Sequence, residues 1–502
     1  MNAWAGDQDC VPLTRVDVGE SEIFSPAAQR RLLAPFFGRC VDADLLRELL
    51  NAVSAYYLDL GFVTTRPYLR EQNILDGQVE IEVLVGTVES IVDADSNARN
   101  SRISSAFAFH GEVLSLRELE TSLEMIERVP SVSARIEIRP GTAQGGSIVA
   151  IKSTEAERFR LELGINAETD LDSQLSLRAA YDNPLNINDI IEFRYNHGDV
   201  RESFQSNRSR ELNYSFPLGS FLWALAYRDI EFEQRVQGIN ESLLSEGESQ
   251  TAKLSLSKLI ARAQVHKVRL GLALELKDSK SFFENQLIDV SSYKTSQVQL
   301  ELQHTWLRSW GQVFTRYAYY EGLDSFGARD DDYFTLEDGS ENEARLQFEK
   351  FIIDSSLYYQ HKPGWFSNAR LVLHYSDDIL FINDQLSLGS PYTVRGYKTA
   401  LSGSNAWYLR YDLVRQLRAV NRLDGDESLA KSLSLGFGID YGEVRCEVDN
   451  SDTCGEIYGL GVNLDIVDKN FSGHLHWGHP LKQIGDDIGD EDRFLLDLRW
   501  MI

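Results

Sequence analysis

The sequence predicts a mainly β protein, a 16-stranded antiparallel transmembrane β-barrel preceded by two small α/β modules. Three observations support this fold class. From residue 158 onward, short segments alternate apolar and polar residues and are separated by turns and acidic loops. Before that point, helix and strand patterns follow each other in two short blocks. The chain has no run of about 18 apolar residues, so we expect no membrane helix, whereas a barrel strand needs only every second residue to be apolar.

We assign residues 10–90 to the first module and residues 1–9 to an N-terminal tail or signal-peptide remnant. Ala3-Trp4-Ala5 has the small-x-small form of a signal-peptidase site, although a start methionine on an ordinary tail is an equal alternative. Gly61 should end the second helix of the module. The expected elements are a strand at 13–18, helices at 26–35 and 43–60, an extended segment at 63–68 and a strand at 79–85.

Residues 91–157 form the second predicted module. It should contain a helix at 116–128 and two strands, at 131–138 and 147–153. Apolar residues recur at helical spacing in the first of these segments and alternate in the other two. The pattern is weaker than in the first module.

Residues 158–502 carry the barrel pattern, and their strands should number sixteen, an even count as in bacterial barrels. If the two modules lie on the periplasmic side, the periplasmic connections include the short turns 182–188, 217–219 and 307–309. The opposite side then receives the long connections 229–248, 321–341 and 381–404, together with 482–491. Short turns on one side and long loops on the other are typical of outer-membrane barrels. We expect strands to begin near Phe159, Ser173, Asp189, Arg208, Ser220, Thr251, Val265, Lys294, Gly311, Glu343, Asn368, Ala406, Leu433, Ile457, Ser472 and Asp492.

The four cysteines fall into two local pairs, Cys10 with Cys40 and Cys446 with Cys454. An even number with local pairing indicates disulfides formed in an oxidising compartment. Each would contribute roughly 2.5 to 4 kcal/mol on the loop-entropy model. Zinc binding by these cysteines is disfavoured, because neither CxxC spacing nor neighbouring histidines occur.

The net charge of −27 argues against a nucleic-acid partner. The glycines of 436–442 do not have GxGxxG spacing and no helix pattern follows them, so we expect them to relieve crowding in a curved strand. We therefore predict no nucleotide and no other cofactor.

Two motifs point to a specific pair of charges. Leu388-Gly-Ser-Pro-Tyr-Thr-Val-Arg-Gly-Tyr397 lies where strand patterns give way to a long loop, and Arg395 sits there between Val394 and the permissive Gly396. A charge inside a barrel needs a partner of opposite sign. We expect that partner to be Asp440, in Gly438-Ile-Asp-Tyr-Gly442. The alternative is two unrelated surface charges.

These motifs, with the two modules before the barrel, resemble the two-partner secretion transporters of the FhaC, ShlB and HecB (TpsB) family, relatives of BamA. The first module also resembles a POTRA domain in Tyr56-Tyr-Leu-Asp-Leu-Gly-Phe-Val-Thr-Thr65. The resemblance implies that loop 381–404 folds into the barrel and that Arg395 pairs there with Asp440. It assigns this loop anchor to Val394, Arg395, Gly396, Tyr397, Asp440 and the strand glycines Gly438 and Gly442.

The resemblance further implies an outer-membrane pore of a Gram-negative bacterium with periplasmic N-terminal modules. It would secrete one large exoprotein (TpsA-like), such as an adhesin, hemolysin or contact-dependent toxin, without nucleotide. Membrane lipid, lipopolysaccharide and the barrel-assembly machinery are the other implied partners. The loop anchor would either prop the pore in a conducting shape or release when substrate arrives.

Several alternatives remain open. A barrel-assembly factor would carry a longer array of periplasmic modules, and an outer-membrane enzyme would need a GxSxG or HExxH motif, neither of which occurs. We therefore predict no enzymatic activity. His474, His476 and His479 cluster near the end of the chain, but no acidic partner is close in sequence, so we predict no metal site. The acidic run Asp330 to Asp338 is expected to be a solvated loop rather than a calcium site.

Overall fold

The computed structural model describes two compact units, divided between residues 156 and 157 apart from two short turns. No helix among the described residues is both long and apolar enough to cross a membrane. The described residues are 10–19, 23–107, 111–169, 173–198, 205–237, 242–331, 344–397, 401–420, 431–446, 454–482 and 492–502.

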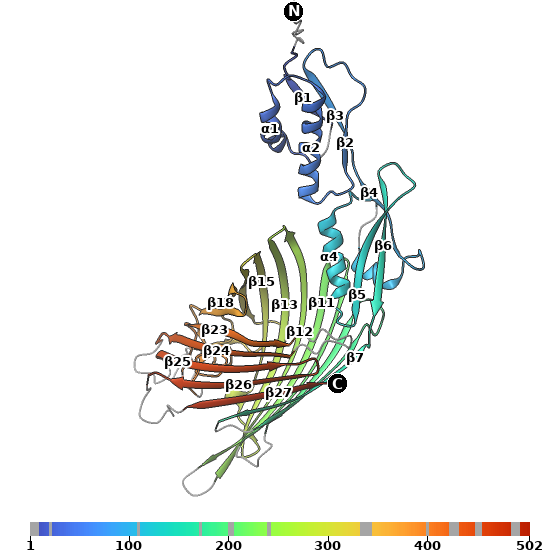
Figure 1. Ribbon diagram of the computed structural model, residues 1–502. Helices are drawn as coiled ribbons and strands as arrows, with labels where there is room; N and C mark the ends of the chain where they lie inside the picture. Colours follow the sequence, from blue (N-terminus) through green and yellow to red (C-terminus); the bar gives the residue numbers. More distant parts are fainter. Residues whose placement is uncertain are drawn as a thin grey trace, which may run out of the picture. The chain divides into compact units, whose positions relative to one another are not determined.

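The first module has the predicted β-α-α-β-β order (Figure 1). Its long helix α2 begins after Asp42, whose side chain accepts a hydrogen bond from the Leu45 amide, and ends at Gly61, whose φ of 95° is left-handed. Leu49 and Tyr57 of this helix are fully buried in the core. The sheet order is β1-β3-β2, with β1 parallel and β2 antiparallel to the central strand. The elements are β1 (Arg15–Val18), α1 (Pro26–Leu33), the 3-10 turn η1 (Ala34–Phe36), α2 (Ala43–Leu60), β2 (Arg66–Tyr68) and β3 (Gln78–Leu84).

The second module contains two elements that the sequence patterns did not indicate, β4 and α3. β4 pairs in parallel with β6, and the sheet order is β4-β6-β5. The expected module boundary after residue 90 therefore falls inside β4, and the second module begins at Thr87. Only Val85 and Gly86 separate β4 from β3, so the two strands look like one segment in the sequence. The elements are β4 (Thr87–Asp93), α3 (Ser101–Ala106), α4 (Leu116–Glu127), β5 (Val132–Pro140) and β6 (Gly146–Glu155).

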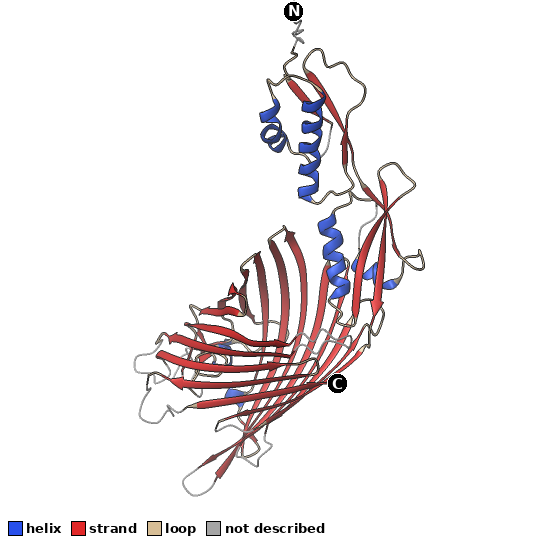
Figure 2. Cartoon of the chain, viewed as in Figure 1, coloured by secondary structure: helices blue, strands red, loops and turns tan. Residues whose placement is uncertain are grey.

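The second unit is a closed antiparallel barrel of sixteen long strands, as predicted (Figure 2). The last strand, β27, pairs with the first, β7, and this pairing closes the sheet. A two-residue strand, β14 (Gln286–Leu287), extends the edge of β13. The long strands are β7 (Phe159–Glu168), β8 (Gln174–Asp182), β9 (Ile190–Gly198), β10 (Gln205–Leu218), β11 (Phe221–Gln237), β12 (Ser242–Arg262), β13 (His266–Phe283), β15 (Tyr293–Arg308), β16 (Gly311–Leu323), β18 (Glu349–Lys362), β19 (Trp365–Tyr375), β23 (Ala406–Val420), β24 (Lys431–Val444), β25 (Gly455–Val467), β26 (Phe471–Pro480) and β27 (Arg493–Met501).

Strands β24 and β27 each have one exposed apolar face and one enclosed face. On β27, Phe494 and Trp500 are 50% and 43% exposed, whereas Arg493 and Leu495 between and beside them are buried. On β24, Phe437 and Ile439 are exposed, and Asp440 is buried on the opposite face. Apolar residues thus face outward, where lipid belongs, and the other face lines the interior.

Two predicted boundaries in the barrel are wrong. The expected long connection 229–248 belongs almost entirely to strands, because β11 and β12 stay paired from Asp229 opposite Gln250 to Gln237 opposite Ser242. These strand ends carry many charged and polar residues and therefore resemble a solvated loop in the sequence, although Ile230, Phe232 and Val236 retain an apolar alternation on one face of β11. The strand expected from Glu343 starts at Glu349 as β18, after the short strand β17 (Ala344–Arg345).

Loop 381–404 connects β19 to β23, the eleventh and twelfth long strands, so it lies at the end of the barrel away from the chain's entry at β7. Its described residues include Leu388, Val394 and Leu401, which are buried and pack with Val372 and Tyr408 of the wall. The loop is therefore folded inward onto β19 and β23 to β25. The short strand β20 (Ile379–Leu380) precedes the loop. The loop itself contains the 3-10 turn η4 (Ile382–Asp384) and the strands β21 (Leu386–Leu388) and β22 (Leu401–Gly403).

Candidate loop-anchoring site inside the barrel

Arg395, at the tip of the inward loop, is the largest fully buried side chain of the described residues. Its Nε and Nη2 donate hydrogen bonds of 2.6 Å to the two carboxylate oxygens of Asp440 on β24. The backbone amide of Arg395 donates a further bond of 3.0 Å to the same carboxylate. Both residues are only 1% exposed. The geometry is the bidentate fork that gives arginine-carboxylate pairs their strength and directionality.

A second carboxylate, which the sequence analysis missed, completes the charge balance. Asp412 on β23 accepts a hydrogen bond of 2.7 Å from Nη1 of Arg395 and one of 3.2 Å from Nε of Arg410. Asn463 on β25 donates a hydrogen bond of 2.8 Å to Asp412 and accepts one of 3.3 Å from Arg395. Two arginines thus face two aspartates in a poorly hydrated site, so no member of the group is left as an uncompensated charge.

The guanidinium lies over a row of glycines that cross the wall in register. Gly438 of β24 is opposite Gly461 of β25, which is opposite Gly478 of β26. A Cβ at Gly438 would lie 2.0 Å from Nη2 of Arg395, and one at Gly461 would lie 2.5 Å from the guanidinium carbon. The wall is therefore hollowed at this row by the absence of side chains. Gly438 was predicted as part of the site, whereas the other two become neighbours only through strand register.

Glycine is also required at the loop tip and beside it. Gly396 has a φ of +93°, and a Cβ there would lie 2.3 Å from the Pro480 nitrogen. A Cβ at Gly459 would lie 2.3 Å from the carbonyl oxygen of Arg395, and one at Gly442 would lie 2.8 Å from Val394. The tip and the wall approach each other as closely as their backbones permit.

The neighbours of Arg395 fix the tip on both sides. Val394 is fully buried in the apolar cluster of the loop and wall. The Tyr397 hydroxyl lies 2.8 and 2.9 Å from the carbonyl oxygens of Tyr458 and Lys482, so its one proton is shared between these two acceptors. All the predicted site residues therefore come together, in one anchor made from the loop and from β24.

The base of the loop has its own contacts, which the sequence did not indicate. Lys350 of β18 donates a hydrogen bond of 2.7 Å to the Asp384 carboxylate. Nδ1 of His374 on β19 lies 2.7 Å from the Ser404 carbonyl oxygen. Arg410 donates to the Pro391 carbonyl oxygen. The loop is thus held at its base and at its tip.

The other predicted residues lie as follows. Cys10 is bonded to Cys40 and Cys446 to Cys454, with Cα atoms 5.2 and 5.1 Å apart. His479 contacts Asp492, at 2.6 Å. In the acidic run, Asp331 accepts from the Leu346 amide, and residues 332–343 lie outside the described part of the chain.

Comparison with known protein families shows three matches that cover most of the chain. The model of the haemolysin secretion/activation proteins ShlB/FhaC/HecB matches residues 145–466. A ShlB-type POTRA domain matches residues 11–86, and a further POTRA domain matches residues 87–140.

Curated relatives align over nearly the whole chain. The outer membrane transporter CdiB of Dickeya dadantii is 26% identical over 482 residues, which cover 94% of this chain and 83% of the relative. The hemolysin transporter protein HpmB of Proteus mirabilis is 24% identical over 445 residues, 86% of this chain and 76% of the relative.

Solved structures share the fold. CdiB from Escherichia coli superposes with a TM-score of 0.88 at 23% identity, covering 100% of this chain and 92% of that one. CdiB from Acinetobacter baumannii has a TM-score of 0.80 at 20% identity, covering 98% and 90%.

Proposed function

Because this chain belongs to the haemolysin secretion/activation protein family ShlB/FhaC/HecB, we propose that it moves one large exoprotein through its barrel to the cell surface. The barrel lies in the outer membrane and the two POTRA modules lie in the periplasm. The exoprotein would be an adhesin, hemolysin or contact-dependent toxin. The protein would act as a conduit and would catalyse no reaction.

The single observation that carries the mechanism is the buried anchor of Arg395. Moving the loop out of the barrel would separate this arginine from both Asp440 and Asp412. Separating a buried charge from its partner costs roughly 3 to 5 kcal/mol. Here Asp440 would lose its arginine, whereas Asp412 would keep Arg410. We therefore propose that the loop stays seated during transport and shapes the exit path, rather than releasing when substrate arrives.

Substrate capture in the periplasm is proposed to use a sheet edge. β5 of the second module is an edge strand of nine residues, whereas the edge strand β2 of the first module has three. An extended segment of the exoprotein can add to such an edge through main-chain hydrogen bonds, which keep it unfolded without demanding a particular sequence. The longer edge offers more of these bonds, so β5 is the proposed main acceptor.

Transport in this proposal needs no nucleotide. The exported chain folds outside the cell as it leaves the pore. The folded part is too large to pass back through the barrel, so transport runs in one direction. The outer face of the barrel would contact lipid and lipopolysaccharide, and the barrel-assembly machinery would insert it. The alternating apolar residues on strands such as β24 and β27 support this placement.

The test is export of the native substrate. Deleting the gene in its own bacterium should remove one large protein from the culture medium or cell surface, measured by quantitative mass spectrometry. Complementation with wild type or with Arg499→Ala should restore it, because Arg499 is half-exposed and its ion pairs are with its strand neighbour Asp497 and with Glu162. Complementation with Arg395→Ala should not restore export, although the barrel still reaches the membrane.

Two results would count against the proposal. Full export by Arg395→Ala would show that the anchor has no part in transport. A general loss of outer-membrane barrels on deletion, with no single secreted protein affected, would instead indicate a barrel-assembly factor.

A further inference from the structure

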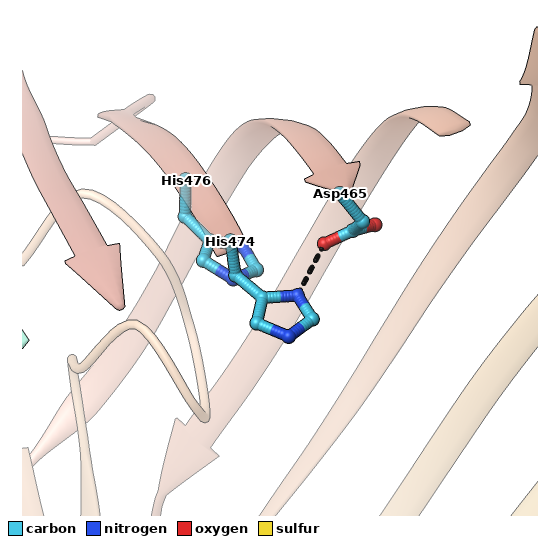
Figure 3. Close-up of side chains that lie close together, drawn as sticks. All are labelled: Asp465, His474 and His476. Carbon is cyan, nitrogen blue, oxygen red and sulfur yellow. Dashed lines mark hydrogen bonds and ion pairs between the residues drawn. The ribbon is translucent and has the colours of Figure 1, made fainter. Parts of the chain in front are cut away.

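Two histidines on β26 and an aspartate on β25 form a cluster on the interior wall (Figure 3). It adjoins the loop anchor, because His476 contacts Asn463. One ring nitrogen each from His474 and His476 and one carboxylate oxygen of Asp465 lie within 4.8 Å of one another. The histidines are two residues apart on one strand face, and Asp465 is directly opposite His474. Figure 3 shows the three side chains converging from the two strands. The sequence analysis discounted a metal because it found no acidic partner, and the hairpin supplies one.

We propose that Asp465, His474 and His476 bind a divalent transition-metal ion of the zinc class. Two imidazoles and one carboxylate are a ligand set that zinc accepts, with water completing the tetrahedron. Oxygen-preferring ions such as calcium and magnesium are disfavoured by the two nitrogen donors.

The hydrogen bonds around His476 orient it for such a role. The Asn463 amide nitrogen donates to Asp412, a carboxylate, so its oxygen is the atom that faces His476. That oxygen lies 2.7 Å from Nδ1 of His476, which must therefore carry the proton. The neutral ring then presents its lone pair at Nε2. Metal-binding histidines are commonly oriented in this way, by an oxygen acceptor on the other ring nitrogen.

His474 and Asp465 are now joined by a hydrogen bond of 2.8 Å. An incoming ion would replace this bond, and any proton on the coordinating nitrogen would pass to water. Binding should therefore weaken as pH falls. Arg395 and Arg410 are not uncompensated charges that would repel an ion, because each contacts an aspartate.

The site has a route of entry. His476 lines a cavity of about 410 Å³ together with Tyr392, Arg410 and Asp412. His474 and Asp465 are each partly exposed, with side chains 33% and 27% accessible. An ion in the barrel interior can reach all three ligands without rearrangement of the wall.

The chain contains two matched controls. His479, on the same strand as His474 and His476, contacts Asp492 just before β27 at 2.6 Å, which makes a pair of one imidazole and one carboxylate. His266 and His304 lie 2.9 Å apart on other strands, which makes an imidazole pair. The three-residue cluster combines both features.

The experiment is zinc titration of the full-length protein in detergent, without a histidine tag, followed by calorimetry. Wild type should bind one Zn²⁺ per chain, and His474→Ala, His476→Ala and Asp465→Asn should each weaken binding about tenfold or more. His479→Ala and His266→Ala should bind as wild type does. The heat-dependent shift of the barrel on gels checks that each variant is folded.

X-ray absorption at the zinc edge keeps the test decisive if a variant does not fold. The wild-type spectrum should contain imidazole scattering from two ligands, with nitrogen and oxygen donors at about 2.0 to 2.2 Å. The proposal is overturned by absence of saturable one-to-one binding, by a spectrum without imidazole, or by equal binding in the folded cluster variants. None of these outcomes bears on whether the protein secretes.

Discussion

Two walls of the barrel interior use arginine and carboxylate in opposite ways. On the wall of β23 to β26, Arg395 is 1% exposed and is held by carboxylates at 2.6 and 2.7 Å. On the wall of β8 to β11, Arg194 pairs with Glu192 at 2.6 Å and Arg228 pairs with Glu211 at 2.7 Å. The side chains of these two arginines are 45% and 52% exposed, whereas their carboxylate partners are 11% and 13% exposed. The contact distances in the two walls are alike, and the exposure of the arginine side chains to water differs.

Hydration decides what each pair can do. A pair whose arginine is half-exposed contributes about 0 to 1 kcal/mol, because water already solvates the guanidinium and competes with the carboxylate for it. A buried pair adds little net stability over apolar packing, but opening it leaves charges that water cannot reach. The first wall therefore holds a loop in one position, whereas the second provides a wet, polar surface. Both properties suit a pore that must keep its shape while a polypeptide slides past.

The largest expected effect is that of Arg395→Ala compared with Arg228→Ala. The first change strands the buried Asp440 and removes one of the two arginines that contact Asp412, so it should lower the free energy of unfolding by roughly 3 to 5 kcal/mol. The second should cost less than about 1 kcal/mol, although Arg228 also makes two bonds to its carboxylate. Urea titration of the barrel in lipid vesicles measures both.

Equal costs for these two substitutions would break the comparison, because they would mean that water reaches the loop anchor. Arg395→Lys sharpens it. Lysine keeps the charge but cannot make the bidentate contact, so it should recover only part of the loss.

An intermediate effect is expected for Gly461→Ala. The added methyl group would lie 2.5 Å from the guanidinium carbon of Arg395 and should push the side chain off Asp440, at a cost of about 1 to 3 kcal/mol. Gly271→Ala is the control, because the nearest atom to a Cβ there is 3.6 Å away, in ordinary contact. Unfolding by urea gives the cost, and a disulfide between introduced cysteines on loop and wall reports the loop position. An unaltered loop in Gly461→Ala would contradict the proposed glycine seat.

The sequence was sufficient to predict those residues of the site that lie within the two motifs, 388–397 and 438–442. Arg395 and Asp440 were paired from two local motifs, and strand alternation predicted sixteen strands. Asp412, Gly461 and Gly478 were missed because only the register of three hairpins places them beside Arg395. Their one signal in the sequence is a polar or glycine residue on the inward face of successive strands, which many barrel strands share.

The errors in the fold have the same origin. The ends of β11 and β12 stay paired, but their many acidic and polar residues between Asp229 and Gln250 resemble a solvated loop in the sequence. β4 forms its sheet with β6, more than fifty residues later, so neither its neighbours nor its own seven residues identify it. Local patterns predict elements that meet a membrane or a core, and they are silent on elements defined by distant partners.

The smallest expected effect is that of Arg194→Ala on the exposed wall. Arg194 lies between Glu192 and Glu211, at 2.6 and 3.6 Å. Its removal leaves each carboxylate with another arginine, because Glu192 also pairs with Arg178 and Glu211 with Arg228. The cost in stability should stay below about 1 kcal/mol and should shrink in 1 M salt, where the screening length is about 3 Å.

The effect of Arg194→Ala should be clearer in ion selectivity, because one positive charge is lost from the interior wall. In a planar bilayer with a potassium chloride gradient, the reversal potential should shift toward cation preference, whereas the outward-facing substitution Phe193→Ala should leave it unchanged. A large loss of stability with no shift in selectivity would mean that Arg194 is a structural anchor like Arg395, and the distinction between the two walls would then fail.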